Sequence, residues 1–190
     1  MHRSKIIEGT VKIAKKSFKM SLRRFYPAYG RNGFKENNLT FQFAHAFCKR
    51  PYSHAFMEVP FYNSKTKKHD FSFDAYIFDN KIGIFLESKR LFNPSKAESV
   101  SKDIGRMNRK NIYYILKQFC EAGQPSRIYT LVLCETWKES VVNWWMDRES
   151  GRIQWDDDGY PSDMIYDFCE VMNWKAESLF WLYAYRRLLK

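Results

Sequence analysis

Two acidic residues and a lysine lie close together in the middle of the sequence, within a stretch rich in aromatic and aliphatic side chains. Asp74 belongs to the run Phe71–Asp79, and Glu87 and Lys89 belong to the run Ile82–Arg90. Both runs alternate apolar and polar residues with a period of two, which is typical of β-strands, and the tight loop between them indicates a hairpin. The three ionisable side chains are therefore predicted to lie on adjacent strands.

The apolar pattern also predicts how the two strands pair. A loop centred between residues 80 and 81 pairs residues whose numbers sum to 161, which places Asp74 opposite Glu87. The apolar residues of both strands are expected to share one face of the hairpin: Phe71, Phe73, Ala75 and Ile77 on the first strand, and Ile82, Ile84 and Leu86 on the second. The opposite face then carries Asp74, Glu87 and Lys89.

A pair of carboxylates in this position has a specific chemical use. Directly opposed strand residues have Cβ atoms about 5 Å apart, and two carboxylates this close both stay ionised only if a positive charge lies between them. Mg²⁺, or Mn²⁺ in its place, suits Asp74 and Glu87, and the backbone carbonyl of Ser88 would add a further oxygen ligand. Lys89 cannot bind the metal, but its ammonium group can position a water or neutralise charge on a phosphate. The alternative is an exposed sheet face that carries an ordinary ion pair.

Other acidic residues are weaker candidates. The triplet Asp-Asn-Lys at 79–81 has the same acid-x-Lys spacing but falls in the predicted turn. Asp70 lies on the same face as Asp74, nearer the start of the strand. Glu58 lies on the preceding predicted strand, where an exposed charge at the strand edge is the simpler interpretation.

The segments on either side of the hairpin show the patterns of the elements that would position it. The sequence predicts helices over 4–25, 34–49, 95–120, 140–146, 163–172 and 176–189, and strands over 55–62, 71–79, 82–90 and 128–134. This order indicates an α/β or α+β fold with a small central sheet flanked by helices. We expect a basic amphipathic helical extension over 1–33, a core over 34–134, and a C-terminal helical part over 135–190 packed on the same domain.

The hairpin and its neighbours resemble the PD-(D/E)xK nuclease superfamily. In that family a helix bearing a glutamate, three strands, a helix and a further strand follow in order, and residues 34–134 reproduce this order. Asp74 and the Glu-Ser-Lys triplet at 87–89 stand at the positions of the motif. The helix glutamate corresponds to Glu36, and Phe73 replaces the proline of the motif.

The resemblance implies an α/β, restriction-endonuclease-like fold, in which helices flank a small mixed central sheet. It also implies Mg²⁺-dependent hydrolysis of phosphodiester bonds in DNA, less often in RNA. On this reading Asp74 and Glu87 bind the metal, Lys89 lies beside the attacking water, and Glu36 supports the metal or the water.

The charge balance agrees with a polyanionic partner. The chain has 32 Lys and Arg against 21 Asp and Glu, a formal net charge of +11, and residues 1–35 hold ten of the basic side chains and one acid. Such a basic region suits nucleic acid, and an anionic membrane surface is the weaker alternative. Lys102, Arg106 and Arg109, spaced by four and three residues on the predicted helix 95–120, are candidates for phosphate contacts or form a solvated face.

Length and composition exclude several classes of protein. A chain of 190 residues with 45% apolar residues is long enough for one domain with a core, and its longest apolar run, 179–185, is far too short to span a bilayer. The four cysteines and four histidines show no zinc-ligand spacing, so we expect reduced thiols in a soluble cytoplasmic protein. The sequence leaves a homodimer open. Two hypotheses follow: a Mg²⁺-dependent deoxyribonuclease, and a catalytically inactive nucleic-acid-binding or assembly protein on the same fold.

Overall fold

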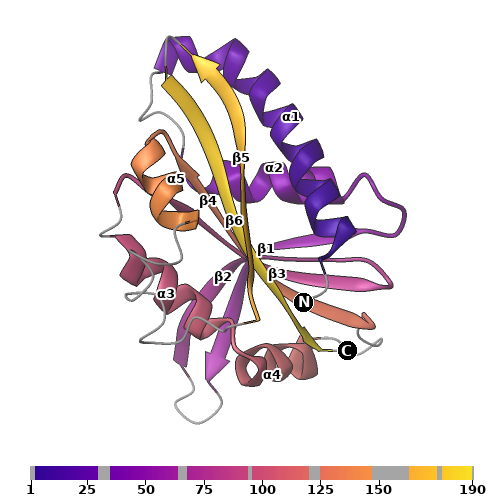
Figure 1. Cartoon of the computed structure of the whole chain (residues 1–190). Helices are drawn as coiled ribbons and strands as arrows, with labels where there is room; N and C mark the ends of the chain where they lie inside the picture. The colour runs from indigo at the N-terminus through magenta and orange to yellow at the C-terminus, as the bar shows by residue number, and fades with distance from the viewer. Residues whose placement is uncertain are drawn as a thin grey trace.

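In a computed structural model of the chain, strands form one mixed sheet with helices on both of its faces (Figure 1). The structure describes residues 3–29, 35–63, 68–93, 96–119, 125–146, 163–174 and 177–189. The helices among these residues are α1 (Lys5–Tyr29), α2 (Asn37–Phe47), α3 (Ala97–Arg106), α4 (Arg109–Phe119) and α5 (Glu139–Met146). The strands are β1 (His54–Asn63), β2 (Lys68–Phe78), β3 (Ile82–Arg90), β4 (Arg127–Thr136), β5 (Ile165–Trp174) and β6 (Glu177–Leu189). The chain therefore has a mixed α/β architecture.

The sheet joins two antiparallel parts through one parallel pair. Its strand order is β1-β2-β3-β4-β6-β5. The neighbouring pairs β1–β2, β2–β3, β4–β6 and β6–β5 are antiparallel, whereas β3 and β4 run parallel. The connection between the parallel strands passes through α3 and α4, as such a pair requires a crossover. β3 and β4 lie inside the sheet and are buried along most of their length.

The predicted register of the hairpin is confirmed where β2 and β3 pair. The paired residues run from Ala75 with Leu86 to Phe78 with Gly83, and each pair sums to 161. Gly83 is required at its position because a Cβ there would come within 2.8 Å of the Tyr76 hydroxyl oxygen. Extending the same register by one residue brings Asp74 beside Glu87.

Asp79 stabilises the turn of this hairpin. Its Oδ1 accepts hydrogen bonds from the backbone N–H groups of Lys81, at 2.7 Å, and Ile82, at 2.9 Å. Its Oδ2 accepts a hydrogen bond from Nε of Arg50 at 3.0 Å. Burial alone would raise the pKa of Asp79, but these bonds outweigh it and lower the pKa below its ordinary value. The acid-x-Lys triplet in the turn is therefore structural.

Helices cover both faces of the sheet, and each face has its own hydrophobic core (Figure 1). α1 and α2 pack on the face that carries Ala75 and Ile77, while α3, α4 and α5 pack on the face that carries Phe85. The predicted face assignment is wrong for Phe71 and Phe73, which pack in the Phe85 core. The strand changes face at Asp74, which lies across from Glu58 of β1, a residue with a left-handed backbone. The face that carries Glu87 is itself buried.

The prediction of C-terminal helices over 163–172 and 176–189 is wrong, because these segments are the strands β5 and β6. β6 lies between β4 and β5 and is buried on both faces, so its apolar residues form a continuous run without the alternation that marks a half-exposed strand. Residues 135–190 therefore contribute two strands to the same sheet as the core.

The predicted helix over 95–120 is divided into α3 and α4. The chain leaves the helical conformation at Met107, and Asn108 Oδ1 accepts a hydrogen bond from the backbone N–H of Asn111 at 2.9 Å. Asn108 thus caps the first turn of α4. Cys120, predicted at the end of the single helix, lies outside the described residues.

α1 packs along the C-terminal strands with the apolar stripe that the sequence predicts. Ile7, Val11, Ala14, Phe18 and Leu22 are buried, whereas Phe25, also expected in the stripe, is 57% exposed. None of the described helices has the length and the apolar character needed to cross a membrane.

Polar contacts fix the start of α1 to the two C-terminal strands. The backbone N–H of Ser4 donates a hydrogen bond to the Tyr185 hydroxyl oxygen at 2.9 Å, and that hydroxyl donates to Glu8 Oε1, also at 2.9 Å. Arg3 Nη1 pairs with Asp167 Oδ2 at 3.0 Å. The first helix and the last strand are thus joined by apolar packing and by a hydrogen-bonded tyrosine.

Candidate active site

Asp74 and Glu87 approach each other from β2 and β3. Asp74 is half-buried, and its Oδ2 accepts a hydrogen bond from the backbone N–H of Ser88 at 2.7 Å. Glu87 is 2% exposed. This hydrogen bond holds the Asp74 carboxylate against β3, next to Glu87. The two acids that the sequence predicts to be neighbours are therefore brought together.

Burial and mutual repulsion make this pair of acids difficult to ionise. Burial, and next the charge of Asp74, raise the pKa of Glu87 to about 8, against the attraction of Arg106 and Lys89. Burial also raises the pKa of Asp74, against its hydrogen bond from Ser88. Glu87 Oε1 is buried and has no hydrogen-bond partner among the described residues. The pair therefore has an unmet requirement for positive charge when both members are ionised.

Lys89 lies two residues beyond Glu87 on the same strand, and a residue of α3 holds its side chain. Lys89 Nζ is 3.1 Å from Asp103 Oδ2, and Asp103 is 3% exposed. Burial has the largest effect on the pKa of Asp74 and of Glu87 and raises both. The ammonium group of Lys89 has a smaller effect and lowers both, because it lies near the pair. The buried ion pair thus fixes the direction in which the Lys89 side chain points.

Arg106 also belongs to this cluster. It forms an ion pair with Asp103, its Nη2 is 3.9 Å from Glu87 Oε1, and its guanidinium lies 5.4 Å from the centre of the Phe71 ring. The predicted basic stripe at 102, 106 and 109 is therefore not a single surface. Lys102 and Arg109 are exposed, Arg106 turns inward toward the acids, and Arg109 begins a different helix.

Glu36 and Ser88 have structural partners. Glu36, at the N-cap of α2, accepts a hydrogen bond on Oε1 from the backbone N–H of Arg90 at 2.9 Å, so it ties the start of α2 to the end of β3. The Ser88 hydroxyl is buried on the α2 side of the sheet, 2.7 Å from the Thr40 hydroxyl. Only the backbone of Ser88 therefore faces Asp74.

Glu58 lies at the same end of the site, on β1. It is exposed and has a left-handed backbone conformation, with φ of 54°, where regular pairing with β2 skips Asp74. Its charge contributes to raising the pKa of Asp74 and Glu87. Left-handed backbone is costly for a residue with a side chain, and strained positions of this kind cluster at functional sites.

The chemistry of these groups fits a divalent cation. No group of three or more His, Cys, Asp and Glu side chains with metal-binding geometry occurs in the described part of the chain. Mg²⁺ commonly takes one or two carboxylates and completes its octahedron with water and substrate phosphate oxygens. Asp74 and Glu87 supply two carboxylates, and the buried Oε1 of Glu87 lacks a hydrogen-bond partner among the described residues.

Sequence reasoning missed Asp103, which holds Lys89. A signal for it exists in the sequence: Asp103 occurs within the apolar stripe formed by Val100, Ile104 and Met107, all of which are buried. An acid on the buried face of a helix requires a cationic partner. The lysine of the motif supplies one.

Comparison of the chain with models of protein families, with curated proteins and with solved structures gives no match. We therefore infer a function from the chemistry of the site.

Proposed function

We propose that this protein is a Mg²⁺-dependent nuclease that hydrolyses phosphodiester bonds in DNA. The observation that carries the proposal is the buried pair of Asp74 and Glu87, in which Glu87 Oε1 has no hydrogen-bond partner within the described residues. A buried, ionised carboxylate without a hydrogen bond is unfavourable even with the Arg106 guanidinium 3.9 Å away, and a divalent cation would reduce that cost. Lys89, fixed by Asp103, places an ammonium group beside the same pair.

The arrangement of the elements supports a restriction-endonuclease-like core. α2, the antiparallel strands β1 to β3, the crossover through α3 and α4, and the parallel strand β4 follow in the order that the family resemblance implies. In this arrangement Asp74 and the triplet at 87–89 lie on adjacent strands, near the start of α2, where Glu36 is located.

Each side chain has a defined role in the proposed reaction. When bound, Mg²⁺ supplies Lewis-acid stabilisation of the phosphate and lowers the pKa of a water. Asp74 and Glu87 would hold the ion through their carboxylate oxygens. Lys89 directs its ammonium group toward the attacking water and the phosphate, where it offsets developing negative charge. Asp103 keeps Lys89 in position, and Glu36 supports the site by joining α2 to β3.

A second candidate is a protein that binds nucleic acid without cutting it. Arg106 favours this alternative, because its Nη2 lies 3.9 Å from Glu87 Oε1 and partly neutralises that carboxylate without a metal. Under this alternative the affinity for nucleic acid depends on basic side chains and falls steeply with salt. Divalent metal then changes neither the DNA nor its binding.

Incubation of the purified protein with supercoiled, nicked and linear DNA, and with RNA, in Mg²⁺, Mn²⁺ or EDTA tests the proposal. Asp74→Asn, Glu87→Gln and Lys89→Met should each reduce metal-dependent cleavage at least about 100-fold, the size typical of losing a charge-stabilising group. Matched controls are Glu170→Gln on an exposed position of β5 and Lys81→Met in the acid-x-Lys triplet of the turn, and both should cut like wild type.

Two results would count against the nuclease. If wild type leaves every substrate intact in Mg²⁺ and in Mn²⁺ but retains DNA in EDTA, the binding protein is the better assignment. If the site variants cut as fast as the controls, the cleavage does not arise from these carboxylates.

A further inference from the structure

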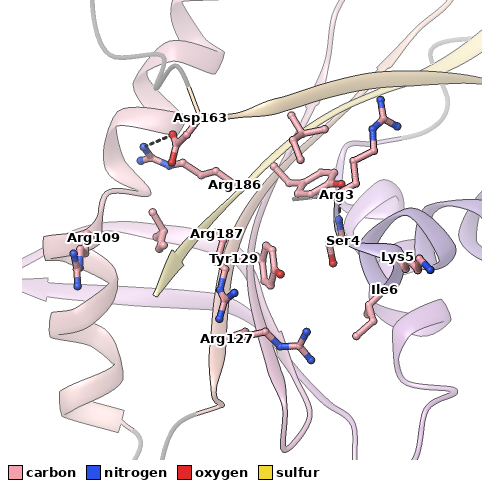
Figure 2. Close-up of a pocket in the computed structure, with 13 residues that line it drawn as sticks. Arg3, Ser4, Lys5, Ile6, Arg109, Arg127, Tyr129, Asp163, Arg186 and Arg187 are labelled. Carbon is pink, nitrogen blue, oxygen red and sulfur yellow. Dashed lines mark hydrogen bonds and ion pairs between the residues drawn. The ribbon is translucent and has the colours of Figure 1, made fainter. Parts of the chain in front are cut away.

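A cavity of about 770 Å³ lies where β4 begins and β6 ends, and its lining is strongly basic (Figure 2). The cations that line it are Arg3 and Lys5 at the start of α1, Arg109 at the start of α4, Arg127 at the start of β4, and Arg186 and Arg187 near the end of β6. Among the described residues, Asp163 is the single carboxylate in the lining. Because Arg3 pairs with Asp167 and Arg186 with Asp163, the excess of positive charge in the cavity comes mainly from the other cations of the lining.

This basic cavity is separate from the acids of the candidate active site. In the parallel ladder of β3 and β4, Arg127 pairs with Ile82, whereas Cys134 pairs with Lys89. The two positions on β3 are seven residues apart, which is about 23 Å at the usual rise of a strand. The cavity and the candidate active site thus lie at opposite ends of these two strands.

Arg186 indicates that the cavity receives an anion. Its side chain is 15% exposed, and its ion pair with Asp163 is long, at 3.8 Å, to a carboxylate that is 60% exposed. Its Nε is buried and has no hydrogen-bond partner in the described part of the chain. Burial lowers the pKa of Arg186. A guanidinium held in this way loses hydration that Asp163 only partly replaces, and an anion in the cavity would replace the remainder.

The distribution of the cations indicates an anion with several phosphates. Five of the six are arginines, whose planar guanidinium binds phosphate through two parallel hydrogen bonds. They come from elements on both faces of the sheet: Arg109 belongs to α4, while Arg3 and Lys5 lie at the start of α1 (Figure 2). Arg109 and Arg127 form no ion pair with any described residue. A single phosphate would contact only part of this lining, whereas a chain of phosphates would contact more of it.

We propose that the basic cavity binds backbone phosphates of nucleic acid at a distance from the bond that is cut. This inference rests on the proposed function for the identity of the ligand. The separation of about 23 Å corresponds to about seven base pairs of duplex at 3.4 Å each. Free polyphosphate has the same chemistry, and the experiment below separates the two sources.

The test measures binding of a fluorescent 20-base-pair DNA by anisotropy in EDTA, over a range of salt concentrations. The double variant Arg109→Gln/Arg127→Gln removes two cations of the cavity. The matched control, Arg23→Gln/Arg24→Gln, removes two exposed arginines of α1 that lie about 28 Å from Lys5, at 1.5 Å per helical residue. We expect the dependence of log affinity on log salt to become shallower by about 2 in the cavity variant and to change less in the control.

Asp163→Asn supplies a test in the opposite direction. Asp163 is 60% exposed, so the substitution has little effect on folding, and removal of the one described carboxylate of the lining should tighten DNA binding. Circular dichroism melting of each variant identifies any that is misfolded. Equal salt slopes for folded cavity variant and wild type, together with unchanged binding by Asp163→Asn, would overturn the inference.

Competition with sodium tripolyphosphate separates the two sources of phosphate. DNA binding that depends on the cavity arginines supports the nucleic-acid assignment. Tripolyphosphate binding that depends on them, without DNA binding, overturns it in favour of free polyphosphate. All binding is measured in EDTA, so it does not depend on cleavage. If the protein cuts DNA but its binding does not depend on the cavity, only this inference is refuted. If the protein binds DNA through the cavity but does not cut it in Mg²⁺ or Mn²⁺, only the nuclease proposal is refuted.

Discussion

Substitution of Glu87 by Gln should stabilise the metal-free protein, although it removes a residue of the proposed active site. The carboxyl of Glu87 is 2% exposed, and its pKa rises from 4.5 to about 8 because of burial first and the charge of Asp74 second. Between pH 4.5 and about 8, the folded state therefore keeps a proton on Glu87 that the unfolded state has released. Its free energy of unfolding falls as pH rises through that window. Gln has the same shape without the charge, so the variant avoids this loss.

The magnitude follows from the two pKa values of Glu87. One pKa unit corresponds to about 1.4 kcal/mol. Relative to acid pH, where Glu87 is protonated in both states, the free energy of unfolding is therefore lower by about 1 kcal/mol at pH 5, about 3 kcal/mol at pH 7 and about 5 kcal/mol at pH 9. These figures already include the attraction of Arg106 and Lys89. The difference in unfolding free energy between Glu87→Gln and wild type should grow by this amount across the pH range.

Urea denaturation in EDTA, followed by tryptophan fluorescence at pH 5, 7 and 9, measures this difference. Glu170→Gln, on an exposed position of β5, is the control and should track wild type at each pH. Addition of Mg²⁺ at pH 9 should stabilise wild type and leave Glu87→Gln unchanged, because a ligand that binds only the folded state raises its stability. A Glu87→Gln variant no more stable than wild type at pH 9 would refute the electrostatic reasoning, and an equal response of both proteins to Mg²⁺ would refute the metal site.

Three further predictions concern acidic residues of the site and of the hairpin turn. Glu58→Gly should raise the free energy of unfolding by about 1 kcal/mol, because glycine accepts the left-handed backbone. It should also weaken Mn²⁺ binding measured by calorimetry, because it removes a nearby carboxylate. Glu58→Gln keeps the cost of the backbone conformation, so it should change only the metal binding. Asp79→Ala should cost about 2–3 kcal/mol in urea denaturation at pH 7, since it removes the acceptor of two backbone N–H groups and an arginine. This difference should begin to shrink as pH falls below the ordinary pKa of an aspartate, about 4, and should continue to shrink toward the lowered pKa of Asp79 in the folded state. Asp103→Asn should lower the free energy of unfolding by about 3 kcal/mol in the same assay, because it leaves Lys89 and Arg106 without their buried counter-charge. A decrease of less than about 1 kcal/mol would show that these ion pairs are not important for stability.

The hairpin register could be predicted from the sequence because its strands carry a strong local signal. A two-residue loop fixes which residues pair. The residue numbers of each observed pair, from Ala75 with Leu86 to Phe78 with Gly83, add to the predicted 161. The assignment of faces was less successful, since Phe73 packs on the side opposite Ala75. The change of face coincides with the irregular backbone of β1 at Glu58, a feature of a neighbouring strand that the period-two pattern of β2 does not contain.

The C-terminal strands could not be recognised by periodicity. β6 is covered on both faces, so polar residues are absent from the positions where alternation would reveal a strand. Its aromatic residues, Phe180, Trp181, Tyr183 and Tyr185, were the available signal, because aromatic side chains favour strands. The position of Lys89 against Asp103 was also beyond the sequence, because it depends on how α3 packs over the sheet.

The contact between α1 and the C-terminal strands has a consequence for the way the chain reaches its native state. α1 precedes the other described elements along the chain, but Tyr185, which binds the start of α1, comes more than 170 residues later. The docking of α1 on the C-terminal strands is therefore among the most non-local steps of folding, which slows the reaction. A circular permutant with residue 189 linked to residue 3 would convert these contacts into neighbours along the chain, and refolding of the permutant should be faster than that of the natural order.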